Sequence, residues 1–156
     1  MNGNKTLIAY ATKSGVTEEN ANIIASVLRD TYKLEVDIIN LKKIKSPDLS
    51  PYKNVIIGSG IRIGRWYKKA KKFLKNDFKD KKVAIYLSSL EAGDPKSRDQ
   101  AIKKYIEEVL AKYTHIKPVA TEAFGGRAKI FKTVTDSRDV EKVKEWANEL
   151  GKKFKI

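Results

Sequence analysis

The sequence contains no cysteine and only one histidine, His115. The absence of cysteine excludes disulfides, thiol catalysis and cysteine-ligated iron–sulfur clusters. No apolar run is long enough to cross a membrane and no signal-peptide segment follows Met1, so we expect a cytoplasmic protein. No Ser/His/Asp arrangement, carboxylate pair or metal-type cluster of His, Asp and Glu is evident, so neither a hydrolase nor a metal site is expected. His115 falls between a predicted helix and a predicted strand, where we expect it at the surface.

Acidic residues are scarce relative to basic ones. The chain has 33 lysines and arginines against 19 aspartates and glutamates, and its formal net charge is +14. A field of this sign attracts nucleic acid, anionic lipid, anionic cofactors and acidic proteins. The cations are spread along the chain rather than gathered in one block, so a solvated lysine-rich surface explains them equally well.

Apolar segments and amphipathic segments alternate along the whole chain. Five strands are predicted, at residues 5–11, 34–39, 54–58, 82–88 and 117–124. Four helices are predicted, at residues 18–32, 66–78, about 94–113 and 138–154. The connection over residues 46–52 holds two prolines and is too short for a long helix. This alternation predicts one domain, residues 1–156, built as a three-layer α/β/α sandwich around a five-stranded parallel sheet.

In such sheets, ligands bind at the carboxyl ends of the strands. The loops to examine are therefore those over residues 12–17, 59–65, 88–94 and 125–130. The first is Thr12-Lys13-Ser14-Gly15-Val16-Thr17, between a buried strand and a helix. Its hydroxyls and the free N–H groups of the helix start suit a phosphate, and the glycine allows close backbone approach. The same residues also fit an ordinary turn with Thr17 as the helix N-cap.

The other three loops are rich in small residues. The run Gly58-Ser59-Gly60-Ile61-Arg62-Ile63-Gly64 follows the third strand, whereas a dinucleotide fingerprint follows the first, so we interpret it as a flexible loop that packs against a flat ligand. Trp66 either offers a stacking face or packs on the sheet. The loop with Ser88, Ser89, Leu90 and Gly93 lets a ligand approach the backbone, or is a turn before Asp94 as a helix N-cap. Gly125 and Gly126, with nearby cations, form a flexible turn or cover an anionic ligand.

The first loop closely resembles the phosphate loop of flavodoxins, and the five alternating units resemble the flavodoxin-like fold with strand order 2-1-3-4-5, for which flavodoxin is a standard example. The resemblance spans nearly the whole chain. It implies FMN, with its phosphate on residues 12–17 and its ring between the loops at 59–66 and 88–93. The implied cofactor-binding residues are Thr12, Lys13, Ser14, Gly15, Val16, Thr17, Gly60, Ile61, Arg62, Gly64, Trp66, Ser88, Ser89, Leu90 and Gly93.

A looser resemblance is to the flavodoxin-domain family that includes the menaquinone-dependent protoporphyrinogen oxidases. It rests on the segment from Gly58 to Tyr67 and on Ala123-Phe124-Gly125-Gly126-Arg127. The long insertion that these oxidases carry near the last strand is not evident in the sequence. The resemblance implies a redox partner protein, or a quinone and a porphyrinogen as substrates, and a basic edge that could contact an anionic membrane.

The resemblance and the charge together lead to two functional hypotheses. The first is an FMN-dependent redox protein, either an electron carrier or an oxidoreductase, in which Arg62, Arg65 and the lysine-rich helix after them make full reduction of the flavin easier, because fully reduced flavin is anionic. The alternative is a basic α/β module that binds nucleic acid without flavin, which we regard as the less favoured interpretation.

Overall fold

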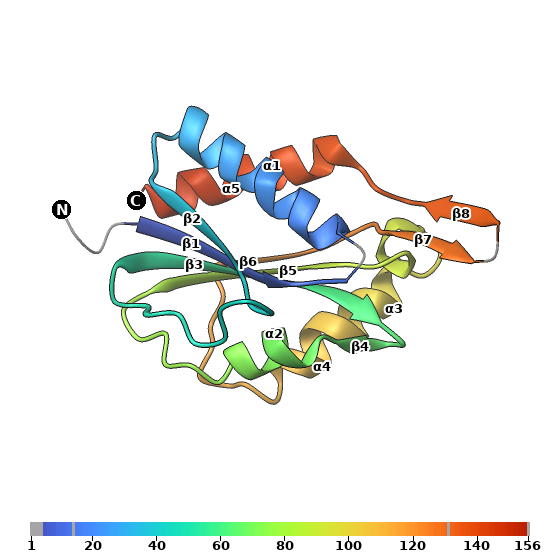
Figure 1. Ribbon diagram of the computed structural model, residues 1–156, viewed down its shortest axis with the longest axis horizontal. Coiled ribbons are helices and arrows are strands. Elements are labelled where there is room, and N and C mark those ends of the chain that lie inside the picture. Colours follow the sequence, from blue (N-terminus) through green and yellow to red (C-terminus); the bar gives the residue numbers. More distant parts are fainter. Residues whose placement is uncertain (1–4, 14, 131, 156) are drawn as a thin grey trace.

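The computed structural model describes residues 5–13, 15–130 and 132–155 (Figure 1). A parallel sheet crosses the molecule in the order β2-β1-β3-β5-β6. Its strands are β1 (Lys5–Ala11), β2 (Val36–Asn40), β3 (Tyr52–Arg62), β5 (Lys82–Ser88) and β6 (Ala120–Phe124). Counting only these five parallel strands, the order is 2-1-3-4-5, which confirms the predicted flavodoxin-like α/β fold.

Helices cover both faces of the sheet (Figure 1). On one face lie α1 (Val16–Asp30) and α5 (Val140–Phe154), which contact each other over much of their length. On the other face lie α2 (Lys68–Phe73) and a longer segment made of α3 (Arg98–Ile102), the π-helical turn η2 (Lys103–Glu107) and α4 (Glu108–Leu110). Among the described residues, no helix combines the length and apolarity that crossing a membrane requires.

The alternation of side chains along β1 builds a core on each side of the sheet. Ile8 packs with α1 and α5 through residues such as Ile24 and Trp146, all buried. Leu7 points to the opposite face, where it joins a cluster that includes Phe73 of α2. Because β1 is central and buried on both faces, its sequence is almost continuously apolar.

Two predicted helices are shorter than the sequence pattern suggested. Residues Arg65–Trp66 form strand β4, which pairs antiparallel with the end of β3, so the predicted helix 66–78 is regular only over α2. The predicted helix 94–113 begins at Arg98. The carboxylate of Asp94 does not cap that helix, because it accepts a hydrogen bond from the backbone N–H of Lys96 (3.0 Å) and so closes a local turn after η1 (Glu91–Gly93).

Two strand features were not predicted. β3 continues to Arg62, four residues past the predicted end, and turns back through β4. The segment after β6 forms a separate hairpin, β7 (Arg127–Ile130) with β8 (Thr133–Asp136), which projects from the right of the molecule in Figure 1. We expected a flexible turn or a loop that covers a ligand there, and no strands, because β8 is exposed along its whole length and so lacks the pattern of a buried strand.

Candidate functional site

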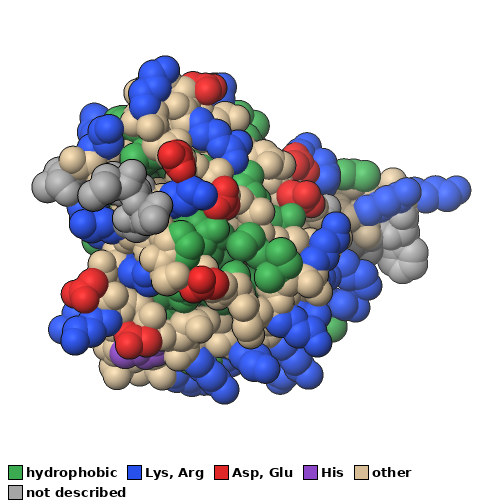
Figure 2. All heavy atoms as spheres, turned by 60° about the vertical axis from the view of Figure 1, so that its left-hand side comes forward, with side chains coloured by type: hydrophobic (Ala, Val, Ile, Leu, Met, Phe, Trp, Pro, Cys, Tyr) green, Lys and Arg blue, Asp and Glu red, His purple; other side chains and the backbone are tan. Residues whose placement is uncertain are grey.

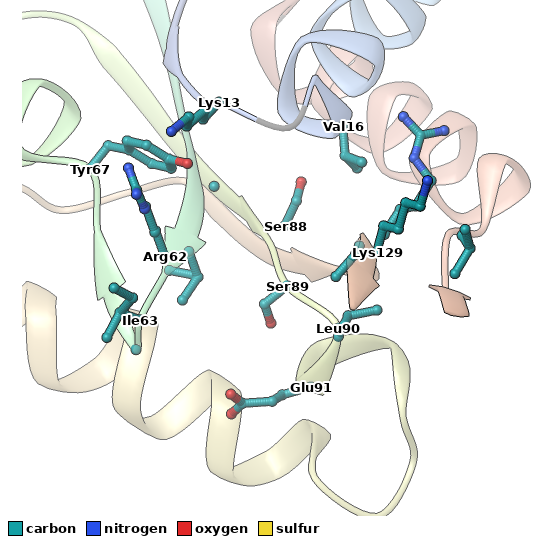
Figure 3. Close-up of a pocket in the computed structure, with 17 residues that line it drawn as sticks. Lys13, Val16, Arg62, Ile63, Tyr67, Ser88, Ser89, Leu90, Glu91 and Lys129 are labelled. Atoms are coloured by element: carbon teal, nitrogen blue, oxygen red, sulfur yellow. The ribbon is translucent and has the colours of Figure 1, made fainter. Parts of the chain in front are cut away.

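A cavity of about 930 Å³ opens at the carboxyl ends of the parallel strands (Figure 3). Figure 3 shows that Lys13 and Val16 line it from the β1–α1 connection, that Arg62, Ile63 and Tyr67 line it from the β3–β4 hairpin, and that Leu90 lies in the β5 loop. The β7–β8 hairpin closes another side. The volume of the cavity is in the range of small-molecule and cofactor sites. The four loops selected from the sequence therefore meet around one cavity.

The first of these loops leads into α1 with an open helix start. Gly15 is the residue before the helix, its φ is +88°, and no side chain caps the helix. A left-handed backbone at this position favours glycine. The turn interpretation with Thr17 as N-cap is therefore wrong, because Thr17 lies inside the first turn of α1. Ser14 lies outside the described residues. The helix start presents backbone N–H groups and the positive end of the helix dipole to the cavity edge.

Two buried hydroxyls at this edge lack a partner among the described residues. Thr12 and Thr17 are 8% and 0% exposed, and the Oγ1 atom of each makes no hydrogen bond to any residue that the structure describes. Both face the same point, since a methyl group added to Gly60 would lie 3.2 Å from Thr12 Oγ1 and 3.3 Å from Thr17 Oγ1. A buried, unpaired hydroxyl costs about 1–3 kcal/mol. The structure thus leaves two oriented donors beside a helix start, which fits a phosphate group.

The first turn of α1 is fixed in place by buried polar contacts to the sheet. The hydroxyl of Tyr86, in the centre of β5, donates to the backbone carbonyl of Thr17 (2.9 Å). Asn20 Nδ2 donates to Ser88 Oγ (3.0 Å). Burial raises the pKa of Tyr86 far above its usual range, so its hydroxyl remains a donor at all physiological pH values. These contacts hold the phosphate loop at a fixed distance from the β5 end.

Most of the residues implied for the cofactor lie around the cavity. Its lining includes Lys13, Val16, Gly60, Ile61, Arg62, Gly64, Ser88, Ser89 and Leu90. Thr12 and Thr17 adjoin it through Gly60. The serines hold the loop: Ser88 Oγ accepts from Asn20, and Ser89 Oγ accepts from the backbone N–H of Ala92 (3.1 Å).

Two of the residues implied for the flavin ring lie outside the lining, as does Gly15 of the first loop. Trp66 is 6% exposed and its indole N–H donates to the carbonyl of Tyr105 (2.8 Å), so it packs against the sheet, as one of our two interpretations proposed. Gly93 faces Ser137 instead, since a methyl group there would lie 2.2 Å from Ser137 Oγ. His115 is at the surface, as predicted. Its Nε2 atom lies 2.8 Å from the carbonyl of Leu74, which follows α2 and does not line the cavity.

Sequence reasoning missed Tyr67 and the β7–β8 hairpin. Tyr67 is the one aromatic residue in the described lining, and it follows Trp66, which carries the stronger sequence signal. From the hairpin, Arg127, Lys129 and Val134 reach the cavity. The pairing of the two segments was not predicted, because each strand is only four residues long and β8 is exposed throughout.

Ion pairs join the base of the hairpin to α1, and Ser137 closes the base itself. Glu19 of α1 accepts from Arg127 (3.1 Å) and from Arg138 (2.7 Å). Arg138 also binds Asp136 and lowers the pKa of that carboxyl to about 2. The backbone of Ser137 donates to Gly126 (2.8 Å). The hairpin base is therefore fixed against the phosphate-loop helix.

The cavity is electropositive. Four cations line it (Lys13, Arg62, Arg127 and Lys129) against one carboxylate, Glu91. The hydroxyl of Tyr105 lies 3.2 Å from Glu91 Oε1, and burial, followed by this carboxylate, raises the pKa of Tyr105. Such a lining favours an anionic occupant and stabilises added negative charge inside the cavity.

Comparison with known proteins agrees with this fold. The flavodoxin domain family matches residues 7–147. Protoporphyrinogen IX dehydrogenase (quinone) of Escherichia coli strain K12 is 30% identical over 109 residues, which are 68% of this chain and 60% of the length of that protein. The chain therefore spans well under two thirds of that relative.

Two flavodoxins match over more of their length. Probable flavodoxin 1 of Bacillus subtilis is 27% identical over 143 residues, which are 92% of this chain and 87% of that protein. The crystal structure of oxidised flavodoxin 2 from Bacillus cereus superposes with a TM-score of 0.66 at 28% identity, and covers 96% of this chain and 99% of its own. With its sheet order, its phosphate-type loop and this match over most of its length, the chain belongs to the flavodoxin domain family, whose cofactor is FMN.

Proposed function

We propose that this chain binds FMN in the cavity at the carboxyl ends of the sheet and works as a redox protein. The observation that carries the proposal is the pair of buried hydroxyls on Thr12 and Thr17, which have no partner in the described part of the chain and face one point beside the start of α1. A phosphate bound at this point would give both hydroxyls a partner and would also accept from the open N–H groups of the helix start.

The phosphate end of FMN would be held by the hydroxyls of Thr12 and Thr17 and by the N–H groups of the α1 start. The ring end would lie between the β3–β4 hairpin, with Ile61 and Tyr67, and the β5 loop with Leu90. Bound FMN supplies reversible one- and two-electron chemistry. This chain would position the cofactor, surround it with the cations of the cavity lining and partly exclude water from it.

The charges of the cavity set the direction in which the protein biases that chemistry. Arg62 and Lys129 lie in the lining, and both stabilise an anion more than a neutral molecule. The fully reduced form of the cofactor is therefore favoured relative to the free cofactor in water. The protein needs no catalytic acid or base for electron exchange.

A finer assignment is a quinone-linked dehydrogenase acting on a porphyrinogen. It is supported by the similarity to protoporphyrinogen IX dehydrogenase of Escherichia coli, and by a cavity whose cations suit a flat molecule that carries carboxylates. The alternative within the same fold is an electron carrier, supported by the similarity to the flavodoxins over more of their length.

One experiment separates these two assignments. The protein is loaded with FMN, freed of excess cofactor, and mixed with protoporphyrinogen IX and menadione without oxygen, and porphyrin fluorescence is followed. We expect multiple turnovers if the chain is a dehydrogenase, with free FMN and FMN-free protein as controls. Reduction and reoxidation of the bound FMN without porphyrin formation would assign the chain as a carrier, and failure to retain FMN would refute the proposed function altogether.

A further inference from the structure

A second hollow of about 570 Å³ lies beside the cofactor cavity, on the other side of the β3–β4 hairpin. Its floor is apolar, formed by Ala11 at the end of β1 and by Trp66 of β4, which are 0% and 6% exposed. Tyr67 forms one wall. The two hollows share Arg62, Ile63 and Tyr67, so a molecule bound in the second would lie next to the cofactor cavity.

A rim of cations surrounds this apolar floor. Five exposed cations line the hollow, and no carboxylate does. They are Lys42, Arg62, Arg65, Lys68 and Lys69. Among the described residues, none of the five has a carboxylate oxygen within 4.0 Å, whereas the ion pairs of the molecule involve other residues. The excess of cations extends beyond this hollow, since Figure 2 shows Lys and Arg side chains over much of another face, several of them gathered at its lower right.

The tip of the hairpin carries an exposed aliphatic side chain on an unfavourable backbone. Ile63 is 88% exposed and has φ +50°, and Gly64 next to it has φ +69°. Positive φ at both turn positions matches the tight turns of β-hairpins, where the first position normally holds Asn, Asp or Gly. A β-branched residue there is strained, and its exposure adds an apolar surface that folding does not bury. The chain thus places an apolar contact at the apex of the rim.

We propose that this surface docks an acidic protein that exchanges electrons with the cofactor. We call it the basic hairpin surface and define it by Lys42, Arg62, Ile63, Arg65, Tyr67, Lys68 and Lys69. An apolar hollow ringed by unpaired charge has the anatomy of a protein interface, with an anchor pocket at the centre and a polar rim. The complementary partner carries carboxylates around one protruding apolar side chain, which enters the hollow.

The charge of the rim calls for an anionic partner, and the apolar hollow at its centre favours a folded acidic protein over the other polyanions. A flat membrane would contact Ile63 but leave the hollow empty, and a nucleic-acid duplex would present phosphates to the rim and leave the apolar floor uncovered. Docking here places the partner against Tyr67 and Ile63, which also line the cofactor cavity, so electrons have a short path. The electron-transfer part of this inference rests on the proposed function, whereas the docking surface itself does not.

The test compares two triple variants that each remove three positive charges. The first, R65Q/K68Q/K69Q, alters the rim but leaves the residues of the cofactor cavity unchanged. The second, K53Q/K152Q/K155Q, changes three exposed lysines at the opposite end of the sheet, at the start of β3 and the end of α5. The probes are an acidic plant-type ferredoxin and a basic c-type cytochrome, titrated by calorimetry against FMN-loaded and FMN-free protein at about 20 mM salt and at about 300 mM salt.

We expect the ferredoxin to bind at low salt and to lose binding at high salt. The rim variant should raise the Kd for the ferredoxin by about tenfold or more, whereas the control variant should change that Kd by less than about twofold. Equal effects of both variants, or equal binding of the cytochrome, would refute a specific surface. Sedimentation with phosphatidylserine vesicles but no binding of the ferredoxin would assign the surface to membranes and refute the protein partner. Loss of FMN binding with docking intact would refute the proposed function alone.

Discussion

Replacing Thr17 with valine distinguishes a phosphate site from an ordinary helix start. If the site binds phosphate, the substitution should stabilise the FMN-free protein and at the same time weaken its affinity for FMN. Thr17 is fully buried, and its hydroxyl has no partner among residues 5–13, 15–130 and 132–155. Valine has nearly the same shape without the hydroxyl, so the FMN-free protein loses an unsatisfied group that costs about 1–3 kcal/mol. We expect its free energy of unfolding to rise by about 1 kcal/mol.

The same substitution should weaken FMN binding. A hydrogen bond to a charged group contributes about 1.5–3 kcal/mol, and each 1.4 kcal/mol is a factor of about ten, so the Kd for FMN should rise about 10- to 150-fold. The same reasoning predicts a loss of similar size for Thr12→Val. Quenching of FMN fluorescence measures the affinity, and urea unfolding of the FMN-free protein measures the stability.

Thr6→Val is the matched control. Thr6 is a fully buried threonine of β1, but its hydroxyl accepts a hydrogen bond from Asn54 Nδ2 (3.1 Å), at the end of the sheet away from the cavity. Its removal should lower stability by about 1–3 kcal/mol and leave FMN affinity unchanged. A Thr17→Val protein that is less stable and binds FMN as tightly as before would refute the reasoning about the phosphate loop.

Three further predictions follow from other parts of the structure. Gly125→Ala should lower stability by more than about 2 kcal/mol in thermal unfolding, because the new methyl group would lie 1.8 Å from the backbone oxygen of Ser137; an unchanged melting temperature would contradict that contact. The pKa of Asp136 is lowered to about 2, mainly by hydrogen bonds from Arg138, so its stabilisation of the hairpin base is complete above about pH 4 and is lost as the pH falls toward 2. A carboxyl NMR titration should show this, and a midpoint near the ordinary value of 3.8 would contradict it. Arg62→Gln should lower the reduction potential of bound FMN, by roughly tens of millivolts for the loss of one cation from the cavity lining, and a rise in potential would contradict the electrostatic argument.

The sheet could be predicted because its signals are local and repeated. Strands such as β1 and β5 are almost continuously apolar, and α5 shows one apolar face through Val143, Trp146 and Leu150. These elements follow from periodicity and turn chemistry. The loop over residues 12–17 was selected because its hydroxyls and glycine fall between a strand and a helix, but its spacing alone fitted both a phosphate site and an ordinary turn. The resemblance to flavodoxins favoured the phosphate, which stays a prediction.

The remaining parts depend on contacts between distant segments. The β7–β8 hairpin is exposed along β8 and fixed at its base by Ser137 and by the Arg138–Glu19 ion pair, which join segments far apart in the sequence. Trp66 entered β4 rather than the following helix, because its indole N–H finds a partner in Tyr105. No local pattern in the sequence encodes either arrangement.

The most direct test of the central claim compares FMN with riboflavin, which has the same ring but no phosphate. Purified protein is mixed with each compound, desalted, and examined for a perturbed flavin absorption band and for stoichiometry. We expect FMN to co-elute at about one equivalent. Riboflavin should bind more than about 100-fold more weakly, because it lacks the phosphate, which makes several charge-assisted hydrogen bonds. Loss of both compounds, or equal retention of both, would contradict a phosphate site formed by Thr12, Thr17 and the start of α1.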